Sequence, residues 1–485
     1  MLRLVQDLVE KLNHQKIIYC HWKSNISIQD ALSGIGDLDL LVNREDVQKF
    51  EGTLAYLGFK RVIDPLQVNC PSIFHFYGLD RDTGILVHLH VYYRVITGES
   101  LLKNYCLPLE KTILKESEIL KDIPVPSKAA ELIVFVLRMM VKHTSMLEYM
   151  LLLRSGEDLR KELEFLLTDE SVKKFPIILE NNLPSVDIKL FNQCLECIQN
   201  KSPLLRHFWL SIKLRRQLKN FNRLSFTSEW LLRAKLFIQR ILWRFLASGK
   251  SKKLASGGAV IAFVGAEATG KSTLVEETRI WLGKVFHVSS VHLGKPPSTW
   301  LSFLPNLTLP IFRRISARDR MSSVIVDSSS KEKDVSLLYA IRSILVAWDR
   351  YQLATKIRRQ VANGKLVICD RYPSAIVGAM DSARLNTLEK KGWKNNILRY
   401  LAKLENQIYR QIPPPDLVIQ LNVPVDVAMK RNQSRDKEEP SDYVLCRHTK
   451  GMIPSFPTSK TIFINSNQSI AETISCVRQS LWDAI

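Results

Sequence analysis

One short segment combines glycines, a lysine and hydroxyl side chains at a spacing suited to phosphate chemistry. Residues 265–273 read Gly-Ala-Glu-Ala-Thr-Gly-Lys-Ser-Thr, which matches the pattern GxxxxGK[ST]. The glycines allow backbone N–H groups to curve around a polyphosphate, and a following helix points its positive end at it. Lys271 would reach the outer phosphates, and the Ser272 hydroxyl would ligate Mg²⁺. The segment therefore predicts a site for a nucleoside triphosphate and Mg²⁺.

The surroundings of this loop favour a working site over a glycine-rich turn without a ligand. A strand-like apolar run, residues 259–264, precedes the loop, and a helical pattern, 273–282, follows it. Asp370 ends a second apolar run, 366–369, and an acid at the tip of a neighbouring strand can hold the Mg²⁺ shell. We therefore expect Ser272 and Asp370 to share one metal ion.

Short apolar runs and helical patterns alternate over the last half of the chain. The runs lie at 259–264, 365–369, 417–421 and 461–464. Such alternation predicts an α/β fold, a parallel sheet with helices on both faces, over residues 256–485.

Residues 256–485 resemble the thymidylate kinases within the nucleoside monophosphate kinase group. The matching features are, in chain order, Glu267 in the loop, Asp349-Arg350, Asp370-Arg371-Tyr372, and residues 415–419 leading to Arg431 and Arg435. The resemblance implies that ATP and Mg²⁺ are cofactors. It also implies that the γ-phosphoryl group of ATP passes to a small phosphorylated acceptor.

The resemblance also implies individual roles. Glu267 and Arg371 would help hold the acceptor nucleotide, and Arg350 looks like the acceptor-side arginine. Arg431 and Arg435, four apart on one helical face, look like a mobile lid, although a solvated charged helix explains them equally well. Residues predicted to bind the nucleotides are Gly265, Glu267, Gly270, Lys271, Ser272, Thr273 and Arg350. Residues predicted to act in the transfer are Lys271, Asp370, Arg371, Arg431 and Arg435.

Three departures bear on the acceptor. Residues 294–297 read Gly-Lys-Pro-Pro where the family usually has Arg-Glu-Pro-Gly. Residues 298–334 look like an insertion, and Asn422 replaces an acid. The acceptor is therefore predicted as a nucleoside monophosphate, thymidylate-like, or a similar small phosphorylated compound.

The N-terminal 105 residues contain a second group of side chains that could bind a metal ion and a nucleotide. Asp37 and Asp39 lie on one face of an expected strand, since side chains alternate, and such a pair can chelate Mg²⁺ around a nucleotide. With Trp22-Lys23-Ser24 upstream, residues 15–100 resemble the nucleotidyltransferase superfamily. Lys23 replaces a glycine of that family, and His88 stands where a third carboxylate is expected. A surface acidic strand without metal, and a degenerate or substrate-binding transferase fold, remain alternatives. His88 and His90 lie on the same face of an expected strand. They would be either metal ligands or ordinary strand histidines.

Residues 106–250 are predicted as a helical region with a basic end. Helical spacing runs from about 127 to 246, with breaks expected at Pro176, Pro184 and Pro203. Residues 201–253 contain fourteen Lys or Arg and one acid, Glu229. The cationic, apolar helix 230–246 would pack on a domain, bind an anionic membrane surface or, less favourably, bind nucleic acid. Residues 247–258 look like a linker.

Composition limits the classes of protein further. An apolar content of 46% excludes disorder throughout, and a formal net charge of +21 favours an acidic partner. The sequence has no uninterrupted apolar run of about 18 residues and no apolar leader at its N-terminus, so we expect a cytoplasmic protein, free or peripheral to the membrane. The eight cysteines are expected as reduced thiols.

The leading functional prediction is ATP- and Mg²⁺-dependent phosphoryl transfer to a nucleoside monophosphate or similar acceptor. The alternative is an ATP-switched protein of the membrane surface or of nucleic acid that phosphorylates no small acceptor.

Overall fold

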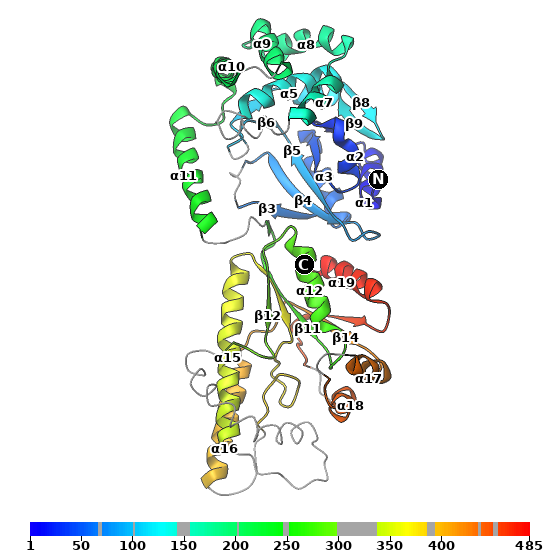
Figure 1. Ribbon diagram of the computed structural model, residues 1–485, viewed down its shortest axis with the longest axis vertical. Coiled ribbons are helices and arrows are strands. Elements are labelled where there is room, and N and C mark those ends of the chain that lie inside the picture. The colour runs from blue at the N-terminus through cyan, green and yellow to red at the C-terminus, as the bar shows by residue number, and fades with distance from the viewer. Residues whose placement is uncertain are drawn as a thin grey trace. The chain divides into compact units, whose positions relative to one another are not determined.

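The computed structural model describes residues 1–65, 70–99, 102–142, 156–200, 203–245, 252–297, 337–385, 393–434, 438–449 and 454–485. The chain divides into two compact units, Met1–Ala255 and Ser256–Ile485. Each unit is built around its own β-sheet (Figure 1).

The first unit contains a mixed, six-stranded sheet in the order β1-β2-β5-β4-β3-β10. Only the pair β2·β5 is parallel among these strands. The strands are β1 Tyr19–His21, β2 Leu38–Val42, β3 Lys60–Ile63, β4 Ile73–Leu79, β5 Leu86–Tyr92 and β10 Lys253–Leu254. Two small hairpins lie outside the sheet: β6 Val95–Thr97 with β7 Tyr105–Leu107, and β8 Ser117–Leu120 with β9 Ile123–Pro126.

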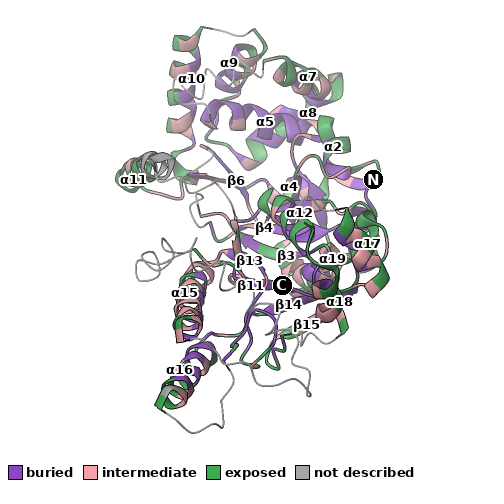
Figure 2. Ribbon diagram, turned by 60° about the horizontal axis from the view of Figure 1, so that its bottom comes forward, coloured by how far each residue is buried: buried purple, intermediate pink, exposed green. Residues whose placement is uncertain are grey.

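Short helices accompany the strands of this sheet, and a layer of longer helices follows them in the chain. Short helices lie among the first strands: α1 Arg3–His14, η1 Asn25–Ser27, α2 Ile28–Leu32, η2 Arg44–Asp46, α3 Val47–Tyr56 and α4 Glu110–Lys115. The layer contains α5 Lys128–Lys142, α7 Gly156–Leu166, α8 Asp169–Asn182, α9 Ile188–Gln199, α10 Leu204–Gln217, η3 Lys219–Phe221 and α11 Phe226–Phe245. Figure 2 shows α5 buried along most of its length. One hydrophobic cluster joins α5 and its helical neighbours to Trp22, Leu41 and Tyr92 of the α/β part, so residues 1–105 and 106–250 share a core.

Several local predictions in this unit need correction. Pro176 lies inside α8 and does not end it, although Pro184 and Pro203 do lie between helices. The hairpin β8·β9 lies in the region 106–250 that was predicted as helical. Part of the expected linker forms β10, which pairs with β3.

Two further sequence features of the first unit have plain structural settings. Cys194 and Cys197 are buried on α9, and the described residues contain no group of three or more His, Cys, Asp or Glu side chains that could hold a metal ion. In α11, Glu229 is buried with Arg215 and Arg233 at 2.9 Å, whereas Trp230 and Leu231 are exposed. Of the helices that the structure describes, none has the length and apolar character to cross a bilayer.

The second unit is an α/β fold with a five-stranded, wholly parallel sheet in the order β12-β13-β11-β14-β15. The strands are β11 Ala259–Val264, β12 Val288–His292, β13 Leu366–Asp370, β14 Leu417–Asn422 and β15 Lys460–Asn465. The four runs predicted from the sequence are confirmed as β11, β13, β14 and β15. The central strands β11 and β13 are almost fully buried, as expected for a parallel sheet covered on both faces.

Helices cover both faces of this sheet, which confirms the predicted fold class. They are α12 Lys271–Gly283, α15 Leu337–Ala362, α16 Trp393–Arg410, α17 Val425–Gln433, α18 Ser441–Thr449 and α19 Ile470–Ala484. Figure 1 shows α15 and α16 on one side of the strands and α12 and α19 on the other. Parallel strands place their carboxyl ends at one edge of the sheet, where ligands bind in folds of this kind.

Candidate functional site

The phosphate loop joins β11 to α12 in the strand–loop–helix setting that its chemistry requires. Gly265 has φ +152°, and a Cβ there would lie 2.6 Å from the Leu421 carbonyl oxygen. Gly270, with φ +87°, is the N-cap of α12. Both positions require glycine, since side chains are strained or excluded there. The backbone N–H groups at the start of α12 are therefore available to a phosphate anion.

Lys271 lies folded onto its own loop. The side chain is buried, and its Nζ donates to the Ala266 carbonyl oxygen at 2.5 Å and to Thr269 Oγ1 at 3.3 Å. Burial, together with the neighbouring Arg371 guanidinium, lowers the pKa of Lys271 to about 8. An anionic phosphate would favour the charged ammonium and offer it better acceptors than a carbonyl.

Ser272 and Asp370 meet where the metal was expected. The Ser272 hydroxyl donates to Asp370 Oδ2 at 2.9 Å, and Asp370 Oδ1 is buried without a hydrogen-bond partner among the described residues. A hydroxyl and a carboxylate oxygen are ligands of the kind that Mg²⁺ takes beside nucleotide phosphates. The pair therefore fits a Mg²⁺ ion. Thr273 follows in the first turn of α12 and is exposed.

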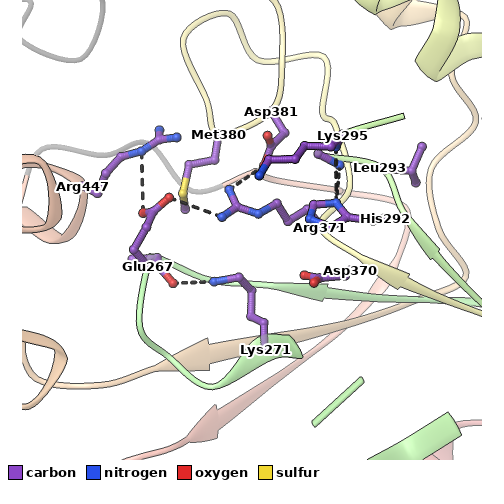
Figure 3. A network of polar contacts seen from close by, with 12 residues as sticks. Glu267, Lys271, His292, Leu293, Lys295, Asp370, Arg371, Met380, Asp381 and Arg447 are labelled. Carbon is purple, nitrogen blue, oxygen red and sulfur yellow. Dashed lines mark hydrogen bonds and ion pairs between the residues drawn. The ribbon is translucent and has the colours of Figure 1, made fainter. Parts of the chain in front are cut away.

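Arg371 projects from the end of β13 into a network of charged groups. Its backbone has φ +67°, an uncommon value for arginine, and its N–H donates to the Phe263 carbonyl oxygen at 3.0 Å. The guanidinium lies 3.5 Å from Glu267 Oε1 and 3.2 Å from Asp381 Oδ2 (Figure 3). Gly294 lets this side chain pass, since a Cβ there would lie 2.6 Å from Arg371 Cδ.

Glu267 is buried between Arg371 and the last turn of α18. Arg447 Nε on α18 lies 3.7 Å from Glu267 Oε2 (Figure 3). His448 Nε2 lies 2.8 Å from the Glu267 carbonyl oxygen. Sequence reasoning missed Arg447 and His448. The available signal was weak: two adjacent basic residues on a short helix after the expected lid.

Arg350 is a positioning residue in this structure. It is buried, and its guanidinium donates to the carbonyl oxygens of Leu293, Gly294 and Asp381 and to the Tyr409 hydroxyl at 2.6–3.1 Å. These bonds occupy the donors that were expected to contact nucleotide. These bonds join the loop at 293–294 to the loop at 381, and the predicted acceptor-side role of Arg350 stays a prediction.

Asp381, which sequence reasoning also missed, links the two arginines. Its Oδ1 lies 3.3 Å from Arg350 and its Oδ2 lies 3.2 Å from Arg371. Burial opposes ionisation, but Arg371 and Arg350 hold the pKa of Asp381 below its ordinary value. This carboxylate therefore orients Arg371 toward the space above the phosphate loop.

The structure describes one of the two predicted lid arginines. Arg431 on α17 donates from Nη2 to the Ser466 carbonyl oxygen at 2.8 Å, next to the end of β15. Arg435 lies outside the described residues. Helices α17 and α18 do pack on the phosphate loop, since Ala428 and Val444 form a hydrophobic cluster with Ala268.

In the first unit, Asp37 and Asp39 lie beside histidines of β5. The carboxylate of Asp37 lies 2.6 Å from His88 Nδ1, and that of Asp39 lies 3.1 Å from His90 Nδ1 and 2.9 Å from Lys23 Nζ. The Lys23 ammonium therefore occupies the side of Asp39 where a cation would bind. This arrangement does not fit Mg²⁺, which needs several oxygen ligands free of competing cations.

Fold and site together define a P-loop nucleotide-binding α/β unit over Ser256–Ile485. The family model described as thymidylate kinase matches residues 318–475. This span contains Arg350, Asp370, Arg371, Arg431 and Arg435, and it begins after the phosphate loop.

Two curated proteins and one solved structure are similar to parts of this chain. The chain is 26% identical over 192 residues to the uncharacterized ATP-binding protein YghR of Escherichia coli K12, covering 38% of this chain and 73% of that protein. The YghR protein of Escherichia coli O6:H1 matches with the same values. A solved thymidylate kinase from Candida albicans is 16% identical and covers 47% of this chain and 90% of that chain, with a TM-score of 0.25.

Proposed function

We propose that the Ser256–Ile485 unit transfers the γ-phosphoryl group of ATP to the phosphate of a nucleoside monophosphate or a similar small phosphorylated acceptor. The observation that carries this proposal is the convergence of Lys271, Ser272 and Asp370 with Arg371 at the carboxyl edge of one parallel sheet. The match of residues 318–475 to the thymidylate kinase family supports it.

The donor side follows from the phosphate loop. Backbone N–H groups at the start of α12 and the Lys271 ammonium would hold the β- and γ-phosphates. Bound Mg²⁺, held by Ser272 and Asp370, would supply charge stabilisation to the phosphates. Lys271 would leave the Ala266 carbonyl oxygen when ATP binds, because phosphate oxygens accept its protons more strongly.

The acceptor side follows from Arg371 and the groups that orient it. A guanidinium offers paired donors to a phosphate, and Glu267 and Asp381 hold Arg371 from two directions. In the transfer, the bond between the β–γ bridging oxygen and the γ-phosphorus breaks as an acceptor phosphate oxygen bonds to that phosphorus. ADP and a diphosphorylated acceptor leave. The protein contributes position and positive charge, which is most of what such a loose transition state requires.

Acceptor dependence of ATP turnover tests the proposal. ADP release is measured with ATP and Mg²⁺ alone and with each member of a panel of nucleoside monophosphates. A matching acceptor should raise turnover by about tenfold or more, and Lys271→Ala should abolish the rise. Turnover that no acceptor accelerates would contradict transfer to a member of that class.

A second candidate rests on α11, for which we propose contact with an anionic membrane surface. Trp230, Leu231 and Ile238 are exposed beside the cations Arg233 and Lys235. Exposed aromatic and aliphatic side chains among cations suit the interface of an anionic bilayer. Cosedimentation with vesicles of anionic lipid, compared with neutral vesicles and with Trp230→Ser, tests this contact; equal recovery with both kinds of vesicle would contradict it.

A further inference from the structure

In the Met1–Ala255 unit, polar side chains of strands β2, β4 and β5 form a row on one sheet face. His90 lies opposite Asp39 on β2 and opposite His75 on β4, and His88 lies opposite Tyr77. The rings stack closely, with centroids 4.3 Å apart for His75 and His90 and 4.5 Å apart for Tyr77 and His88. The row is mostly buried, so its ring positions are fixed by packing.

Each carboxylate of this row lies against Nδ1 of one histidine. A carboxylate can only accept a hydrogen bond, so His88 donates from Nδ1 to Asp37 at 2.6 Å. His90 Nδ1 lies 3.1 Å from Asp39 Oδ1 and 3.1 Å from the Tyr92 hydroxyl, and the Lys103 ammonium at its Nε2 leaves the ring proton on Nδ1. The Nε2 atoms of these neutral rings are then acceptors. Asp37 and Asp39 therefore orient the rings of His88 and His90 in this structure.

Lysines from outside the sheet use these acceptors. Lys103 Nζ lies 3.2 Å from His90 Nε2, and Lys252 Nζ lies 3.3 Å from His88 Nε2. Each ammonium donates to a neutral imidazole, which does not cancel a positive charge as a carboxylate would. Two chains of the same kind result, in which an ammonium, an imidazole and a carboxylate follow one another.

Lys23 brings another ammonium to the same place. Lys23 Nζ lies 3.1 Å from the Tyr92 hydroxyl and Lys103 Nζ lies 3.5 Å from the same oxygen, so the two cations are neighbours. Burial, together with the repulsion from Lys23, lowers the pKa of Lys103 to about 8. The backbone is also strained here, since Lys103 has φ +44° and Ser24 has φ +58°. Neighbouring like charges on strained backbone cost stability, a cost that an anion bound between them would offset.

We propose that Lys23, Lys103 and Lys252 form a metal-independent site for a phosphate-bearing anion on this sheet face. The cations come from parts of the chain far apart in sequence and converge on one row of acceptors that fixes their positions. Because Lys23 already pairs with Asp39 at 2.9 Å, the positive charge at this site comes from lysine side chains. The site lies in the Met1–Ala255 unit and stands independently of the function proposed for the second unit.

Calorimetric titration of the full chain with sodium pyrophosphate in EDTA tests the proposal. All proteins carry Lys271→Ala, so that binding at the phosphate loop is weakened equally. We expect binding without metal, weakened by about tenfold or more in Lys103→Met and in Lys23→Met. The matched control is Lys111→Met, an exposed lysine on α4, which should bind as the parent does.

Thermal unfolding without pyrophosphate separates a ligand site from a structural network. Removing one of two neighbouring charges should leave the midpoint of Lys103→Met equal to or above that of the parent. Three results would each overturn the proposal: binding that requires Mg²⁺, binding that is unchanged in both lysine variants, or an absence of binding in the parent protein. A lowered midpoint in Lys103→Met together with unchanged binding in Lys23→Met would show that these lysines serve only the fold.

Discussion

The Ser272 hydroxyl and Asp370 Oδ2 lie 2.9 Å apart, which joins the first turn of α12 to the end of β13. The other oxygen of Asp370 is buried and lacks a partner among the described residues. We predict that Asp370→Asn lowers ATP turnover by about a hundredfold or more, since the amide removes the charge that holds Mg²⁺. Affinity for an ATP analogue in EDTA should change little. Turnover within a few-fold of the wild type at saturating Mg²⁺ would mean that Asp370 holds no metal.

Arg371 should act on the acceptor. We predict that Arg371→Ala raises KM for the phosphorylated acceptor by about tenfold or more and leaves the affinity for an ATP analogue nearly unchanged. Initial rates at varied acceptor concentration check the first part, and equilibrium titration checks the second. Arg410→Ala, which removes an exposed arginine from α16, is the control. A collapse of analogue affinity with an unchanged acceptor KM would place Arg371 on the donor side.

Arg350 should matter for stability. Its guanidinium is buried and bonds to several oxygens that Arg350→Ala would leave unsatisfied. We predict a loss of about 3–5 kcal/mol in the free energy of unfolding, with little rescue by Arg350→Lys, whose ammonium cannot span the same acceptors. Denaturant unfolding measures this. A loss below about 1 kcal/mol, as expected for Arg410→Ala, would show that these bonds contribute little net stability.

A buried carboxyl in the first unit should make stability depend on pH. Burial raises the pKa of Glu131 on α5 to about 7, and its Oε1 accepts from the Asn25 N–H at 3.0 Å. The folded chain holds this proton more tightly than the unfolded chain. The stabilisation is therefore complete at low pH and is lost as pH rises from about 4.5 to about 7.

Glu131→Gln should remove this dependence and keep an acceptor for Asn25. Relative to the wild type, we expect it to gain roughly 2 kcal/mol in unfolding free energy between about pH 5 and pH 8. Glu118→Gln changes an exposed glutamate on β8 and should show no such gain. Parallel pH profiles for Glu131→Gln and the wild type would contradict the assignment.

The parts of the fold that could be predicted are those with a local signal. Strands β11, β13 and β14 are buried in a parallel sheet and read as continuous apolar runs. Strand β12 was missed because it lies at the sheet edge, with the polar residues Ser289, Ser290 and His292 in place of such a run. The phosphate loop was predictable because its spacing is fixed by the backbone turn that surrounds a phosphate.

The remaining site residues depend on tertiary contacts that local pattern does not encode. Asp381 and Arg447 reach Arg371 and Glu267 from segments whose own patterns carry no chemical signal. In the first unit, Lys103 meets His90 only because a loop brings it to the sheet face. The charge of a motif residue can be predicted from the sequence, but the residue that pairs with it in the folded chain cannot.

Transfer of labelled phosphate from [γ-³²P]ATP to a nucleoside monophosphate is the most direct test of the central claim. The full chain is incubated with labelled ATP, Mg²⁺ and each acceptor, and the products are separated by chromatography. We predict label in a diphosphorylated acceptor for at least one compound, and a loss of several orders of magnitude in Lys271→Ala protein that retains its circular dichroism spectrum. Label found only in inorganic phosphate, or equal transfer by the folded Lys271→Ala variant, would contradict the proposed function.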